Sequence, residues 1–209
     1  MGFFFIFAAV KKIFFILCCL VSTSFAGNIA EEVLSTYLKG FNPLTDYSCG
    51  DVGYSETINS AEKTNITIAK SCEKELTHSK YTIKIVKSYD KIPWKEEYTE
   101  GYNKSNMLKT SVYFPESKYA NEQIEHTDKV VIINNYLVHY TFEPLPNNNK
   151  LRFNKEVNAN AQVLISPITS KKPGILISVQ GKNIARDDFL SILQTLDFGK
   201  IEHNILSGE

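Results

Sequence analysis

The chain has 209 residues, and its 23 basic and 23 acidic side chains give a formal net charge of zero. This balance excludes the basic field of a nucleic-acid-binding protein. Hydrophobic and aromatic contents of 43% and 12% exclude a disordered or low-complexity chain, and the length suits a single domain.

Residues 1–26 have the pattern of a secretory signal peptide. Lys11 and Lys12 precede an apolar run over residues 13–21, and small residues at the −3 and −1 positions mark a cleavage site after Ala26. We therefore expect an exported protein, periplasmic or secreted, that begins at the residue after this site and has no membrane span once it is cut.

Three alternatives concern the same segment. It could be retained as a membrane anchor, although the two lysines divide the apolar residues into runs shorter than the roughly 20 residues of a span. Cys18 or Cys19 could carry a lipid. The apolar residues ahead of the lysines also suggest that translation starts near Val10, through an alternative start codon.

Cleavage after residue 26 leaves Cys49 and Cys72 as the only cysteines. Two cysteines in an exported chain predict one disulfide, which would close a loop of about two dozen residues and contribute roughly 3 kcal/mol. The alternative is a catalytic thiol, which requires a reduced cysteine and a nearby base.

The apolar spacing predicts a helix over residues 28–41, with Gly40 as its C-terminal cap, followed by a turn-rich stretch. From Thr64 onward apolar and polar residues alternate, as in antiparallel strands with one apolar face. The predicted strands lie around residues 64–69, 81–86, 108–114, 129–133, 136–142, 163–168 and 175–179. Asn134 and Asn135 predict a two-residue hairpin turn, because asparagine tolerates a positive φ.

A second helix is predicted near the C-terminus, starting at Asp187 and ending before Gly199. Its apolar stripe consists of Phe189, Ile192, Leu193 and Leu196. Residues 200–209 are predicted to be a tail. Together these elements predict an α+β fold: one domain over residues 27–199, with a mostly antiparallel sheet of about seven strands and N-terminal and C-terminal helices packed on it.

The C-terminal strand and helix carry a family resemblance. Ile175-Leu176-Ile177-Ser178-Val179, a polar turn, and the helix from Phe189 to Phe198 resemble the end of PsbP-like domains. Those domains are small exported or lumenal α+β sandwiches. The resemblance implies a non-enzymatic assembly or binding role, and it carries no functional residue to this chain.

Motifs for catalysis, metal binding and phosphate binding are missing from the sequence, so no catalytic residue, metal or cofactor is predicted. Two histidines support an alternative as an exported hydrolase. His126 has Glu125 and Asp128 close to it in the sequence, and His139 lies within a predicted strand. Both also suit purely structural roles.

The candidate binding residues follow the second predicted strand. They are the aromatic residues Tyr89, Trp94, Tyr98 and Tyr102, with charged residues between them. Aromatic rings among charges are how proteins stack on sugars or anchor partners. The alternative is that these rings pack over the sheet as part of a long connection. We expect an exported protein with a non-enzymatic binding or envelope-assembly role, whose partner is an unknown protein or another envelope component.

Overall fold

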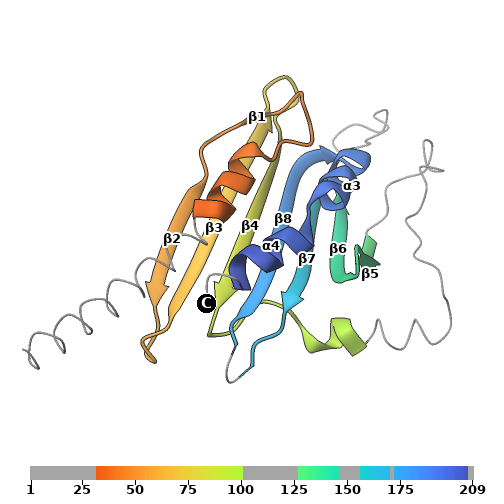
Figure 1. Cartoon of the computed structure of the whole chain (residues 1–209). Helices are drawn as coiled ribbons and strands as arrows, with labels where there is room; N and C mark the ends of the chain where they lie inside the picture. Colours follow the sequence, from red (N-terminus) through yellow and green to blue (C-terminus); the bar gives the residue numbers. More distant parts are fainter. Residues whose placement is uncertain (1–31, 101–126, 146–155, 170–171, 207–209) are drawn as a thin grey trace, which may run out of the picture.

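The structure is a computed structural model that describes residues 32–100, 127–145, 156–169 and 172–206. It has one antiparallel sheet of eight strands, and helices lie against one face of it (Figure 1). The α+β fold predicted from the sequence is confirmed. The signal peptide, the strand at residues 108–114, Tyr102 and His126 fall outside the described residues and stay predictions.

The strands follow an order that places the last one in the middle of the sheet. Their bounds are β1 Ser48–Cys49, β2 Gly53–Ile58, β3 Thr64–Lys74, β4 Ser79–Ser88, β5 Thr127–Ile133, β6 Tyr136–Pro144, β7 Glu156–Ser166 and β8 Gly174–Ala185. The spatial order is β1-β3-β4-β8-β7-β6-β5, and β2 also pairs with β3. Strand β8 therefore joins the β1–β4 half of the sheet to the β5–β7 half.

The turn between β5 and β6 has the predicted conformation. Asn134 and Asn135 have φ values of 50° and 70°, and Ile133 pairs with Tyr136 across the turn. The asparagine pair thus fixes the register of this hairpin, because only a few residue types adopt positive φ at low cost.

The core lies between one face of the sheet and the helices. Ile83 and Ile85 of β4 and Ile177 and Val179 of β8 face it, and none of the four is more than 2% exposed. Helix α3, Arg186–Thr195, packs on β7 and β8. Its predicted stripe of Phe189, Ile192 and Leu193, together with Leu196 just after the helix, is fully buried.

The C-terminal residues differ from the predicted tail. Helix α3 ends at Thr195, and a second helix, α4, spans Phe198–Leu206. Ile201 and Ile205 are buried in the core, because they continue the apolar spacing from Phe198 onto the same sheet. The Asp197 carboxylate accepts a hydrogen bond from the Lys200 amide at 2.9 Å and so caps the start of α4, and Gly199 lies inside this helix instead of ending the one before it.

The N-terminal helix, residues 32–40, ends in a way the sequence did not indicate. Gly40 does not have the positive φ of a glycine cap. Instead Lys70 of β3, only 3% exposed, points its ammonium group at the end of the helix. The ammonium donates hydrogen bonds of 2.8, 3.0 and 2.8 Å to the carbonyl oxygens of Leu38, Lys39 and Phe41. Burial lowers the pKa of Lys70, and the three carbonyl acceptors compensate for the lost hydration.

The predicted disulfide is present. Cys49 of β1 and Cys72 of β3 are bonded, with their Cα atoms 4.0 Å apart. The neighbouring residues Gly50 and Ser71 are a hydrogen-bonded pair of the ladder, because the Gly50 amide donates to the Ser71 carbonyl at 3.0 Å. The cysteines are therefore a non-hydrogen-bonded pair, in which the side chains of opposite residues lie closest together. Neither sulfur is free for the alternative role of a catalytic thiol.

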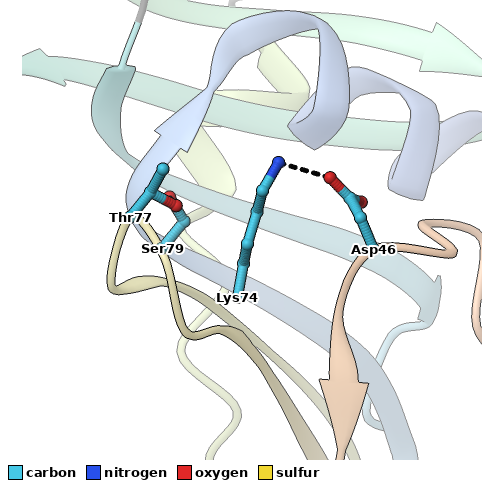
Figure 2. Close-up of polar contacts among 4 residues, drawn as sticks. All are labelled: Asp46, Lys74, Thr77 and Ser79. Carbon is cyan, nitrogen blue, oxygen red and sulfur yellow. Dashed lines mark hydrogen bonds and ion pairs between the residues drawn. The ribbon is translucent and has the colours of Figure 1, made fainter.

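Polar contacts hold the same end of the sheet (Figure 2). The Lys74 ammonium, at the end of β3, pairs with the Asp46 carboxylate in the loop before β1. This hydrogen bond lowers the pKa of Asp46 and raises the pKa of Lys74. In the adjoining turn the Thr77 and Ser79 hydroxyls are 2.6 Å apart. The loop between the N-terminal helix and β1 is thus fastened by both the disulfide and the ion pair.

Candidate functional site

The face of the sheet opposite α3 and α4 carries rows of polar side chains. Side chains alternate between faces along each strand, so the residues between the core positions project to this second face. The register aligns one row across six strands: Ser71, Thr82, Gln180, Asn160, Thr141 and Asp128. The next row is Lys84, Ser178, Gln162 and His139. We call these ten residues the polar rows.

Contacts within the polar rows support this shared orientation. The Ser71 and Thr82 hydroxyls lie 2.8 Å apart, and the Asp128 carboxylate reaches His139 diagonally across two strands. The amides of Asn160 and Gln162 are half-buried between them. The polar rows therefore place hydrogen-bonding side chains next to one another on neighbouring strands.

An apolar row borders the polar rows. Its members, aligned by the same register, are Val86, Leu176, Leu164, Leu137 and Ile132. The chain after β4 covers part of it. The side chains of Ile92 and Ile168 lie so close to Gly174 at the start of β8 that a methyl group added there would be 3.0 Å and 2.4 Å from them, respectively. Ile92 is 8% exposed and Leu176 is fully buried, so this connection packs on the second face.

His139 lies where the polar rows meet that connection. The residue is 5% exposed, and its Nε2 is 2.7 Å from the Asp128 carboxylate. The Tyr98 ring stacks on the imidazole with the centroids 3.8 Å apart and an interplanar angle of 18°. The other ring nitrogen, Nδ1, is buried and has no hydrogen-bond partner among the described residues. Burying a nitrogen without a hydrogen-bond partner costs free energy, which a bound group that pairs with Nδ1 would recover.

Trp94 extends this arrangement. Its ring meets the Tyr98 ring edge-on, with the centroids 5.4 Å apart, and its Nε1 donates to the Thr99 hydroxyl at 3.2 Å. The Lys95 ammonium lies 5.6 Å from the centre of the Tyr98 ring, and its pKa is raised first by Tyr98 and then by Glu97. We call Trp94, Tyr98, His139 and Asp128 the aromatic–histidine cluster.

The structure brings together only part of the predicted binding set. Trp94 and Tyr98 are in contact, and their segment packs over the sheet as the alternative interpretation held. Tyr89 lies apart from them: its ring is 4.8 Å from the Lys63 ammonium near the turn between β2 and β3.

Other residues of this face were not singled out from the sequence. Asn160, Gln162 and Gln180 lie in stretches that were not assigned to strands, although Val157, Ala159, Ala161 and Val163 alternate with amides there. That alternation was the signal for an extended β7 with a polar face.

The cluster contains half of a hydrolytic site. The Asp128–His139 pair has the geometry of a base oriented by a carboxylate. Within the described residues no serine, threonine or cysteine side chain bonds to the imidazole, and no group of three or more metal-ligating side chains occurs. The arrangement can accept and donate hydrogen bonds and stack rings, and its described part holds no nucleophile in reach.

A shallow groove of about 630 Å³ lies elsewhere, between the β5–β6 turn and the junction of α3 and α4. The Tyr136 hydroxyl there donates to the Glu202 carboxylate at 2.6 Å, which raises the pKa of Tyr136 to about 12. Asp197, also in its lining, already caps α4. Because these polar groups are paired with each other, the groove is a weaker candidate than the aromatic–histidine cluster.

Comparisons with protein-family models, with curated proteins and with solved structures found no match. They add nothing to the resemblance of the C-terminal segment to PsbP-like domains. Among the helices of the described residues, none has the length and apolar character needed to cross a membrane.

Proposed function

We propose that this protein is an exported, non-enzymatic binding protein that holds its partner on the second face of the sheet. The observation that carries the proposal is His139: a nearly buried imidazole, beneath a tyrosine ring and beside half-buried amides, with one nitrogen that has no partner among the described residues. Most buried polar groups in proteins are hydrogen-bonded, so a ligand that pairs with this nitrogen would gain the interaction that the described residues do not supply.

The disulfide supports the exported part of this proposal, because disulfides persist in oxidising compartments such as the periplasm or the cell exterior. Cleavage after Ala26 is the direct test. Mass spectrometry of the protein isolated from its own cells should find an N-terminus at Gly27. An intact N-terminus in a cytoplasmic fraction would refute export.

Hydrogen–deuterium exchange tests the binding face. Envelope extract from the source cell should slow amide exchange in β6, β7 and residues 92–100, while α3 stays unchanged. The double variant Asn160→Ala/Gln162→Ala should lose this protection. Gln194→Ala, at an exposed glutamine on α3, is the matched control and should retain it. Protection of α3 alone, or none, would contradict the proposed face.

An exported hydrolase is the second candidate, and the 2.7 Å contact between Asp128 and His139 favours it. Hydrolysis of an ester or amide substrate that is lost in both Asp128→Asn and His139→Asn would establish it. Activity that survives both substitutions would exclude this pair as the catalytic base.

A further inference from the structure

We propose that the partner held by the polar rows is a neutral glycan that lies across strands β8, β7 and β6. This inference rests on the function proposed above and names the chemical class of its ligand.

On these three strands the polar rows offer Ser178 and Gln180, Asn160 and Gln162, and Thr141 and His139. None of these side chains carries a fixed charge. The charged residues that border them have both signs: Lys84 and Asp128 within the rows, and Lys80, Lys182 and Glu143 in the next row of the same face. An ionic ligand needs a counter-charge to offset its lost hydration, and the side chains at the centre of the rows supply none. A neutral ligand has no such need.

The polar rows also have a hydrogen-bonding capacity that suits sugars. Carboxamides and hydroxyls both donate and accept, which is also the property of sugar hydroxyls. The longer row repeats such a group on four neighbouring strands from β4 to β6, about 4.8 Å apart, so these strands span about 14 Å. A regular ladder of donors and acceptors suits a polymer that presents hydroxyls at regular intervals.

The aromatic–histidine cluster supplies the apolar surface that a sugar also needs. The rings of Trp94 and Tyr98 stand at the border of the polar rows, and Trp94 is held in place by Thr99. Aromatic rings offer an apolar surface against which the C–H face of a sugar ring can pack. Amides below and rings at the side match the two kinds of surface that a sugar presents.

The His139 Nδ1 has no hydrogen-bond partner among the described residues. A hydroxyl satisfies this nitrogen in either tautomer, because it can donate or accept. Because Nδ1 is buried, a ligand hydroxyl reaches it only after neighbouring side chains shift, and Tyr98 is the described ring that covers a face of the imidazole. Binding should therefore change exchange in residues 96–100 as well as in β6 and β7.

The test divides the envelope extract into three portions before the exchange experiment. One portion stays untreated, one is digested with a protease that is then inactivated, and one is oxidised with periodate, which cleaves the vicinal diols of sugars. We expect protection of β6 and β7 to survive protease and to disappear after periodate. Gln162→Glu keeps the size of the side chain but adds a charge. It should raise the amount of protease-treated extract needed for half-maximal protection about tenfold or more, the equivalent of one or two hydrogen bonds.

The outcomes separate the two proposals. Protection lost to protease, or retained after periodate, would overturn the glycan and leave a binding protein for another partner, such as an extended peptide. Absence of protection with the untreated extract would overturn the proposed function as well. Gln194→Ala should match the parent protein in every arm, and both β7 variants should show the parent's circular dichroism, so that lost binding is distinguished from lost folding.

Discussion

Each face of the sheet buries a basic side chain, Lys70 on one face and His139 on the other, and their surroundings differ. On the helix-covered face the Lys70 ammonium has three carbonyl acceptors within 3.0 Å. On the other face His139 has one carboxylate partner and a second nitrogen with no partner in the described residues. The surroundings also differ: aliphatic core side chains lie near Lys70, whereas amides and aromatic rings lie near His139.

Under the proposed function, the difference is that between a structural polar group and one that binds a partner. Lys70 replaces the water at a helix end with protein carbonyls, so its burial strengthens the attachment of that helix to the sheet. His139 keeps part of its hydrogen-bonding capacity unused at the border of a polar surface. Stability should therefore depend on the first face and binding on the second.

The largest expected effect on stability belongs to the apolar part of the helix-covered face. Leu193 is fully buried between α3 and the sheet, so Leu193→Ala should lower the free energy of unfolding by about 2–5 kcal/mol. Urea denaturation measures this. Leu76→Ala, at a leucine that is 93% exposed, is the control and should change little. A near-zero effect at Leu193, with loss of a binding partner, would make α3 the recognition element.

Lys70→Met tests the polar part of the same face. The substitution keeps the length of the side chain and removes the donor, so buried carbonyls are left without a partner at a cost of about 1–3 kcal/mol. Thermal and urea unfolding give the change. Lys84→Met, at an exposed lysine on the next strand, should be nearly neutral. Equal effects at both sites would mean that capping by Lys70 contributes nothing.

His139→Phe should have a smaller effect on stability and a large one on binding. Phenylalanine can still stack on Tyr98, it removes the unpaired nitrogen, and the 58% exposed Asp128 side chain remains hydrated. The free energy of unfolding should change by about 1 kcal/mol or less, while the exchange protection by envelope extract is lost. Strong destabilisation with unchanged protection would erase the distinction between the two faces.

The smallest effect concerns the ion pair at the rim of the helix-covered face. The Lys74 hydrogen bond lowers the pKa of Asp46 below its ordinary value of 3.8. The charged carboxylate therefore adds to the free energy of unfolding above pH 3.8, and this stabilisation is lost as pH falls through the pKa of the folded state. Asp46→Asn should therefore flatten the loss of stability in acid, measured by urea midpoints at successive pH values. Burial raises the pKa of Asp188, so Asp188→Asn should steepen the same curve.

Most of the fold could be predicted because its strands alternate clearly or contain a diagnostic turn. Ile83 and Ile85 mark β4 as a strand, and the asparagine pair marks the β5–β6 hairpin. Strand β2 was missed because all of its residues, Gly53–Ile58, are exposed, so no apolar period distinguishes it. Helix α4 was missed because Gly199 looked like a stop, although Ile201 and Ile205 continue the pattern.

The site could be predicted only in part, because it depends on register between distant strands. Trp94 and Tyr98 were singled out as aromatic residues among charged ones. The stacking of Tyr98 on His139 depends on how the connection after β4 lies over β6. The contact between His139 and Asp128, eleven residues away, follows from how β5 pairs with β6. Asn160 and Gln180 come together through the β7–β8 ladder, which local composition does not indicate.

The position of β8 also bears on how the chain reaches this fold. Strand β4 pairs with β3 on one edge, and its other edge finds a partner only when β8, which begins at residue 174, is available, so the two halves of the sheet cannot join earlier. Such distant pairing pays a large loop-closure entropy before any contact compensates for it, which makes folding slow. Until then β4 and β7 each have an unpaired edge that can bind another copy of the chain. A chaperone that protects the nascent protein should therefore bind these two strands.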